Sequence, residues 1–309
     1  MDLVVAALTG LSRTWIRGLF DHGGVTMNGH PAPDPGGRVA AGDFVEVTWD
    51  PHNRTREKRR PWIDPAFRVL YEDEHVIVVD KAAFVLTVPT QHGETDTLVQ
   101  RVRRYLGKGG AEGKATVVQR LDHGTSGVMV FAITEAAASG LIEQFKRHTP
   151  AREYVALVAG LVKDDRGTIE SRLATNRRLS RYSTTSGEGE RAVTHFEVEA
   201  RLQDATRIRV RLETGRRNQI RVHFAEAGHP VLGDTRYRPE LARHPRWRSR
   251  RQALHAAVLG FTHPITGQSM RFDSPLPAEF GTFREVAAPL TPRRRRSRRS
   301  GPPGTSTPA

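Results

Sequence analysis

After residue 65 most of the chain consists of short strand-like segments: some are continuous apolar runs, and those at 167–173, 192–202 and 206–214 alternate between apolar and polar residues. Helical spacing of apolar residues is limited there to three segments, 96–106, 135–148 and 218–228. Strands are predicted at residues 67–73, 75–83, 128–132, 152–160, 167–173, 192–202, 206–214, 254–264 and 269–277. Because strands are many and hairpin connections outnumber helical crossovers, the pattern indicates an α+β fold with a largely antiparallel sheet.

The first 50 residues form a separate pattern of helix, hairpin and strand. A helix is predicted at residues 12–24 from its apolar spacing, with a pair of glycines at its end. Asn28-Gly29 is a strong signal for a hairpin turn after a short strand at 25–27, and another strand is predicted at 44–49. We therefore expect a small α+β domain at residues 1–50.

Composition separates the rest of the chain into three parts. Residues 51–64 are mostly polar and charged, which is typical of a linker. Residues 65–288 hold the strand-rich pattern and form the main domain. Residues 289–309 contain six arginines and no acidic residue, and their low complexity predicts a disordered tail.

The chain carries a formal net charge of +14, from 48 Lys and Arg residues against 34 Asp and Glu residues. The tail accounts for six of these charges, which leaves +8 for the remainder. A basic protein favours a polyanion such as nucleic acid as its partner. The absence of cysteine excludes disulfides and thiolate chemistry, and the sequence has neither a run of membrane-spanning length nor a signal peptide. We expect a cytoplasmic protein that does not bind membranes.

The segment RLDHGTSG, which begins at Arg120, lies between two apolar runs and contains two charged residues. Arg120 and Asp122 are two positions apart, so an extended backbone places them on one face. Gly124, Thr125 and Ser126 are candidate hydrogen-bond donors to Asp122, which would keep its carboxylate ionised as a nucleophile or base. A turn in which Asp122 only accepts backbone hydrogen bonds is the structural alternative. The hydrolase signatures Gly-x-Ser-x-Gly and Asp-Thr/Ser-Gly do not fit this segment.

Two further segments contain candidate functional residues. Arg216 and Arg217 are predicted at the N-terminus of a helix, a place suited to phosphate, and Arg221 and His223 follow on the next turn. Arg221 is a candidate partner for a catalytic carboxylate. Tyr154 alternates with apolar residues on a predicted strand, where a tyrosine is usually part of the core, although its ring can also stack on a base.

Together these segments resemble the RluA-type RNA pseudouridine synthases over residues 67–280. Five motifs carry the resemblance in order along the chain: DEHVIVVDKAA, RLDHGTSG, EYVALV, TGRRNQIRVHFAEAGHPVLGD, and LHAAVLGFTHPITGQ with the SPLP that follows it. The helix and hairpin of the first 50 residues are similar to the S4 RNA-binding module that often precedes this domain.

The resemblance implies a pseudouridine synthase fold, a mixed and largely antiparallel sheet flanked by helices, in an enzyme that isomerises uridine in RNA with no cofactor or metal. Asp122 would start the reaction by attacking the sugar or the base, or by removing a sugar proton. Tyr154 would pack on the target base and assist proton removal, and Arg221 would pair with Asp122. Arg120 would fill the gap that the flipped base leaves. Other basic residues would contact the RNA: Arg216, Arg217, His223, and Arg13 and Arg17 of the S4-like module.

Ribosomal RNA is the expected substrate and transfer RNA the alternative, with the protein acting as a monomer. Two other classes stay open: a catalytically inactive RNA-binding protein on the same scaffold, and a hydrolase that uses Ser126 or Asp122. The chain departs from the family pattern at Gln119 and Asn218, where the family usually has histidine, and at Arg152, where it usually has lysine. These departures concern the target site rather than the chemistry.

Overall fold

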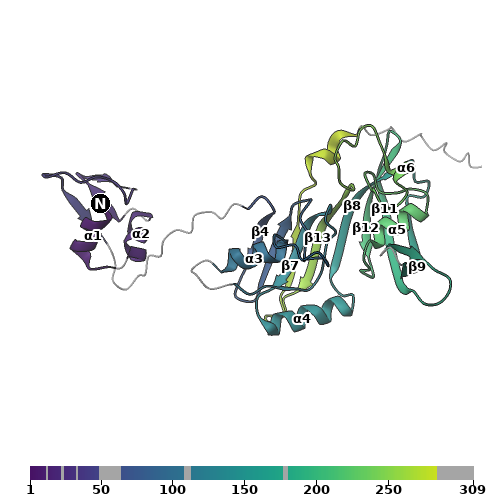
Figure 1. Cartoon of the computed structure of the whole chain (residues 1–309), viewed down its shortest axis with the longest axis horizontal. Helices are drawn as coiled ribbons and strands as arrows, with labels where there is room; N and C mark the ends of the chain where they lie inside the picture. Colours follow the sequence, from purple (N-terminus) through teal and green to yellow (C-terminus); the bar gives the residue numbers. More distant parts are fainter. Residues whose placement is uncertain are drawn as a thin grey trace, which may run out of the picture. The chain divides into compact units, whose positions relative to one another are not determined.

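The computed structural model describes residues 1–11, 13–21, 24–32, 34–48, 64–107, 113–176 and 180–283. It divides the chain into two compact units, Met1–Ile63 and Asp64–Ala309 (Figure 1). The predicted tail and all of the predicted linker except Asp64 lie outside the described residues. Each unit encloses a hydrophobic core of its own.

The N-terminal unit contains helices α1 (Asp2–Thr9) and α2 (Arg13–Asp21) and a three-stranded antiparallel sheet. Its strands pair in the order β2-β1-β3, with bounds β1 (Val25–Met27), β2 (His30–Pro31) and β3 (Val45–Val47). Asn28 and Gly29 form the predicted hairpin turn, with φ of 54° and 78°. Helix α1 has no counterpart in the sequence prediction. Its Val5 is buried in the same core as Ile16 and Leu19 of α2, so packing rather than intrinsic propensity stabilises this short helix.

The larger unit is built on one 11-stranded sheet with the order β10-β9-β11-β12-β8-β13-β7-β5-β4, in which β14 pairs with β13 and β6 pairs with β7. The strand bounds are β4 (Phe67–Glu72), β5 (Val76–Lys81), β6 (Thr116–Val117), β7 (Ser126–Ala132), β8 (Ala151–Ala159), β9 (Arg166–Thr175), β10 (Arg181–Ser183), β11 (Glu190–Leu202), β12 (Ala205–Leu212), β13 (Leu254–Thr262) and β14 (Ser269–Asp273). The prediction of an α+β fold with a largely antiparallel sheet is confirmed. The short strands β6 and β10 were not predicted.

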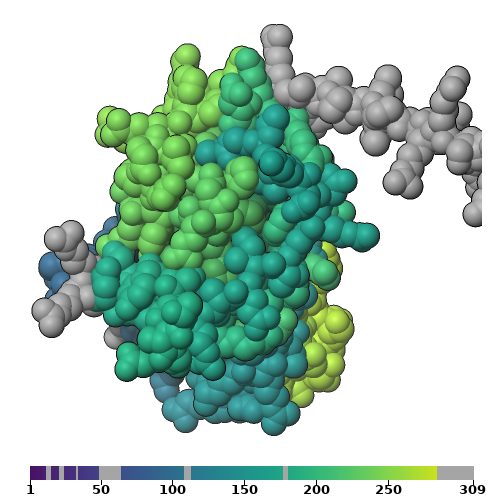
Figure 2. All heavy atoms as spheres, turned by 90° about the vertical axis from the view of Figure 1, so that its right-hand side faces the viewer, coloured from purple at the N-terminus to yellow at the C-terminus, as the bar shows by residue number. Residues whose placement is uncertain are grey.

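Helices cover this sheet and form part of the connections between its strands. They are α3 (Leu98–Leu106), α4 (Glu135–Lys146), α5 (Gln219–Glu226), the single turn α6 (Pro239–Ala242) and the 3₁₀ turn η1 (Ala278–Thr282). Figure 1 shows α3 and α4 beside the β4–β7 half of the sheet and α5 beside β11 and β12. Seen from the β9 end, the residues from β8 to α6 form a continuous teal and green surface (Figure 2). No helix within the described ranges is long and apolar enough to cross a membrane.

The two halves of the sheet meet where β7 runs parallel to β13, the single parallel pair among the described strands. Ser126 and Gly127 of β7 lie opposite His255 and Ala256 of β13. Gly127 has φ of 118°, and a Cβ atom there would lie 2.1 Å from the carbonyl oxygen of Ala256. Only glycine fits such a close approach. This junction places the segment that precedes β7, including Asp122, between the two halves of the sheet.

Candidate active site

A cavity of about 860 Å³ opens beside the junction of β7 and β13. Three chain segments contribute most of its lining: residues 86–92, 117–123 and 215–221. The lining contains five arginines, Arg120, Arg216, Arg217, Arg221 and Arg236, and a single carboxylate, that of Asp122. A cavity with this charge balance suits a phosphate-bearing ligand.

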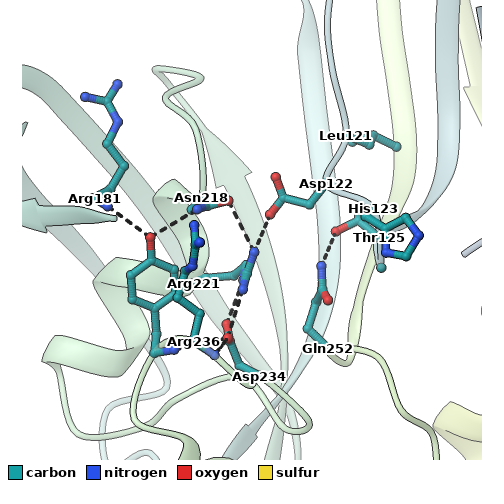
Figure 3. Close-up of polar contacts among 12 residues, drawn as sticks. Leu121, Asp122, His123, Thr125, Arg181, Asn218, Arg221, Asp234, Arg236 and Gln252 are labelled. Carbon is teal, nitrogen blue, oxygen red and sulfur yellow. Dashed lines mark hydrogen bonds and ion pairs between the residues drawn. The ribbon is translucent and has the colours of Figure 1, made fainter. Parts of the chain in front are cut away.

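Asp122 and Arg221, which are 99 positions apart in the sequence, form an ion pair in this cavity. The Arg221 Nη1 donates to the Asp122 Oδ2 at 2.9 Å (Figure 3). The Asp122 side chain is 25% exposed, whereas the preceding Leu121 packs into the core. Asp122 therefore faces the cavity, which Arg120 also lines.

The loop that carries Asp122 is held by Lys81, not by the donors that the sequence suggested. Lys81 is 1% exposed, and its Nζ donates to the carbonyl oxygens of Thr125 at 2.7 Å and Ala82 at 2.9 Å, with longer contacts to those of Asp122 and His123 at 3.4 Å. Burial lowers the pKa of Lys81 to about 7, and the negative charge of Asp122 opposes this shift. The buried amino group of Lys81 at the end of β5 thus fixes the backbone of the loop.

Thr125 and Ser126 have other partners than the Asp122 carboxylate. The Thr125 N–H donates to the backbone carbonyl oxygen of Asp122, and the Ser126 hydroxyl bonds to Nδ1 of His255 at 2.8 Å. The prediction that these two residues donate to the carboxylate is wrong, because the Thr125 amide closes the turn and the Ser126 hydroxyl is bonded to a buried histidine. Arg221 provides the hydrogen bond instead.

Tyr154 lies on β8 at the wall of the cavity and is 9% exposed. Its neighbours across the strands are Val210 of β12 and Ala256 of β13. Burial raises the pKa of Tyr154 above its ordinary value, with the Arg152 guanidinium lowering it and the Asp122 carboxylate raising it further. The phenol is therefore neutral at physiological pH.

Arg216 and Arg217 line the cavity just before α5, as the sequence suggested for residues at a helix start. Arg216 Nη1 is 2.9 Å from Oε1 of Glu190, and its Nε donates to the carbonyl oxygen of Arg191. Arg217 is exposed. Asn218 adopts the left-handed conformation at the N-cap, with φ of 57°.

His223 does not reach the cavity. It is 1% exposed, and its ring nitrogens bond to Ser171 Oγ at 3.0 Å and Thr194 Oγ1 at 2.9 Å. The prediction that His223 contacts RNA is therefore wrong. Helix α5 buries both of its sides, so its spacing alone does not distinguish an inward from an outward residue.

The two arginines predicted to bind RNA from the N-terminal unit belong to α2. The side chain of Arg13 lies outside the described residues, and that of Arg17 is exposed. Their part in RNA binding stays a prediction.

Sequence reasoning missed Asp234, which contacts Arg221 from the side opposite to Asp122, and Tyr237, whose ring packs on the Arg221 guanidinium. Asp234 accepts from Nε and Nη2 of Arg221 at 2.6 and 2.9 Å (Figure 3). The Tyr237 ring centroid is 5.2 Å from the Arg221 Cζ. The signal available was the acidic residue that ends the motif TGRRNQIRVHFAEAGHPVLGD. Among the described residues, no cluster of three or more His, Asp or Glu side chains could hold a metal ion.

Three residues that depart from the family pattern, Gln119, Asn218 and Arg152, lie in or beside the cavity. Gln119 lines it, and its Nε2 is buried without a hydrogen-bond partner in the part of the chain that the structure describes. Asn218 bridges Arg221 and the hydroxyl of Tyr237. Arg152 is buried, and its Nη2 donates to the carbonyl oxygen of Glu213 at 3.0 Å.

Comparison with known proteins gives one consistent result. Residues 75–226 match the RNA pseudouridylate synthase family. An uncharacterized RNA pseudouridine synthase of Bacillus subtilis is 35% identical over 277 residues, which cover 89% of each chain. A protein of Zymomonas mobilis named ribosomal large subunit pseudouridine synthase D is 35% identical over 295 residues, which cover 90% of each chain.

A solved structure shares the fold. Human RNA Pseudouridylate Synthase Domain Containing 1 superposes with a TM-score of 0.59 at 24% identity, over 72% of this chain and 91% of that chain. The sequence relatives, at 35% identity over about nine tenths of the chain, show the family. The chain belongs to the RluA-type family of RNA pseudouridine synthases, which are isomerases.

Proposed function

We propose that the protein converts a uridine of ribosomal RNA to pseudouridine, with Asp122 as the residue that starts the reaction. The observation that carries the proposal is the placement of one carboxylate among five arginines in a cavity of ligand-binding size. Arg216, Arg217 and Arg236 would bind the phosphates that flank the target, and Asp122 would meet the nucleoside itself. Ribosomal RNA is preferred as the substrate because several relatives are named ribosomal large subunit pseudouridine synthase D.

The target uridine would leave its stack and enter the cavity, at a cost of a few kcal/mol. Asp122 then attacks the sugar or the base, or removes a sugar proton; each route breaks the bond between C1′ and N1 and forms one between C1′ and C5. The hydrogen at C5 leaves as a proton, and N1 takes up a proton. Tyr154 lies in the cavity wall, where its ring can contact the base. Arg120 would occupy the space that the flipped base leaves in the RNA stack.

The first experiment replaces Asp122 by Asn and measures tritium release from RNA that contains 5-[³H]uridine. We expect release by the wild type and none above background by Asp122→Asn, because the amide is neither a nucleophile nor a base of comparable strength. RNA affinity, measured by filter binding, should change little. Normal turnover by the variant would contradict the role of Asp122, and a wild type without turnover on any RNA would favour the inactive RNA-binding alternative.

The second experiment identifies the substrate. Pseudouridine mapping of total RNA from a strain without this gene should show a site missing from ribosomal RNA. A missing site in transfer RNA alone would support the alternative substrate.

A further inference from the structure

The guanidinium of Arg221 lies between two carboxylates that contact different edges of it. Asp234 accepts hydrogen bonds from Nε and Nη2, at 2.6 and 2.9 Å, whereas Asp122 accepts only from Nη1, at 2.9 Å. The Asp234 side chain is fully buried and that of Arg221 nearly so. A two-point contact fixes the plane of a guanidinium far better than a single hydrogen bond does. The position of Nη1 is therefore set by Asp234.

Asp234 is in turn held by the backbone. The N–H groups of Arg236 and Tyr237 donate to its Oδ1 at 2.8 and 3.1 Å. The preceding Gly233 has φ of 73°, and a Cβ atom there would lie 2.2 Å from the carbonyl oxygen of Arg251. This turn has no room for a side chain at position 233, and its backbone fixes the direction of the Asp234 carboxylate.

Two more residues, Tyr237 and Asn218, restrain Arg221. The Tyr237 ring packs on the guanidinium, and its hydroxyl oxygen accepts from Nδ2 of Asn218 at 3.0 Å. The Oδ1 of Asn218 accepts from Nη1 of Arg221 at 3.2 Å. Figure 3 shows Asn218 and Asp122 approaching the same end of the guanidinium, with Asp234 at the other.

This arrangement has a consequence for Asp122. Because Asp234 occupies the two-point edge of Arg221, Asp122 receives a single hydrogen bond, on Oδ2. Among the described residues, no other side chain donates to the Asp122 carboxylate. Asp234 also balances the charge of Arg221, so the guanidinium orients Asp122 without a full uncompensated positive charge beside it. One oxygen of Asp122 is left for the substrate.

We propose that Asp234 is a positioning residue for the reaction: it fixes Arg221 so that Nη1 alone holds Asp122 and the second oxygen of Asp122 faces the nucleotide. This inference rests on the proposed function, because it gives Asp234 a part in the step that Asp122 starts. Asp234 acts through Arg221 and does not touch the RNA. Its loss should therefore lower kcat and leave RNA binding unchanged.

The test compares Asp234→Asn with the wild type by tritium release from uridine-labelled RNA. The Asn side chain keeps the shape and can still accept the two backbone N–H groups, but it loses the charge and one acceptor for Arg221. We expect kcat to fall by about 10- to 100-fold, the loss that a small displacement of a catalytic group causes, with KM changed less than about twofold. Asp64→Asn is the matched control, because it also breaks a pair of a buried Asp with an arginine, Arg101, and should leave kcat unchanged.

A double-mutant cycle separates positioning from general support of the fold. In an Arg221→Gln background, adding Asp234→Asn should cause no further loss of kcat, because the residue through which Asp234 acts is already gone. The same comparison applies if Asp234→Asn alone folds poorly, since the double variant contains no unpaired buried charge at this site. An unchanged kcat for Asp234→Asn, or a further loss of kcat in the Arg221→Gln background, would overturn the inference while the proposed function stands. A wild type that releases no tritium would overturn both.

Discussion

At the scale of single residues, Tyr154 combines a wall position in the cavity with a phenol that stays protonated. Burial raises its pKa above 10, so no ionised form is available near neutral pH to act as a base. Its hydroxyl can still donate a hydrogen bond or relay a proton through water, whereas its ring can contact the base. These two parts of the side chain can be tested separately.

Replacement of Tyr154 by Phe keeps the ring and removes the hydroxyl. We expect the single-turnover rate of tritium release to fall by about 100-fold, the lower end of what acid–base assistance contributes, with little change in RNA affinity. Because the phenol is neutral throughout, the ratio of the wild-type rate to the Tyr154→Phe rate should stay constant from pH 6 to pH 9. An unchanged rate would remove the hydroxyl from the mechanism, and a loss of affinity of the same size as the loss of rate would indicate a binding role instead.

The sequence predicted which residues meet in the cavity better than it predicted what holds them. The resemblance placed Asp122, Tyr154 and Arg221 together, and the structure brings these three to one cavity. Lys81 and Asp234 were missed, because their partners lie 41 and 13 positions away and only the folded sheet brings them into contact. Local spacing contains no information about such pairs, and it assigned the Thr125 and Ser126 donors wrongly for the same reason.

At the scale of elements, helix α5 shows how a motif can contain both site and core residues. Arg221 faces the cavity, whereas His223, two positions later, is enclosed between Ser171 of β9 and Thr194 of β11. Burial lowers the pKa of His223 to about 4, with the Glu226 carboxylate opposing the shift. An unfolded histidine titrates near 6.5. Folding therefore favours the neutral ring.

The pH dependence of stability tests this assignment of His223 to the core. The folded-state pKa lies below the unfolded value, so the contribution of His223 is complete above pH 6.5 and is lost as the pH falls toward 4. Between pH 7 and pH 5 we expect the free energy of unfolding of the wild type to fall by ~2 kcal/mol more than that of a His223→Gln variant. Urea denaturation, monitored by circular dichroism, measures the free energy of unfolding of each protein at each pH. Equal losses in the two proteins would mean that the ring is solvated rather than buried.

The strand pattern was predictable element by element, but the order of the strands was not. Alternation and short apolar runs together located β4, β5, β7, β8, β9, β11, β12, β13 and β14. The parallel contact of β7 with β13 depends on a glycine, Gly127, that allows two distant strands to approach, and the two-residue strand β6 is too short to produce a period. The site lies beside that parallel contact, so its position in the sheet, unlike the identity of its main residues, required the structure.

At the scale of the whole molecule, the positive charge is unevenly distributed between the parts. Residues 1–50 contain three arginines and six acidic residues, whereas residues 51–63 contain five Lys or Arg and one Glu. The first 50 residues therefore have a net charge of −3, although their helix and hairpin resemble an S4 module. Attraction to the phosphate backbone must come mostly from residues after position 50.

Two truncations separate the module from the basic segment that follows it. Deleting residues 1–50 removes at most three phosphate-binding cations, so the slope of log affinity against log salt should become shallower by no more than about 3. We expect a weaker affinity from lost contacts of the module and an intact fold of the remainder, since the larger unit has its own core. Deleting residues 1–63 removes five further cations and should reduce the slope more than the first deletion does. Equal affinity with and without residues 1–50 would mean that the S4-like module does not bind RNA in this protein.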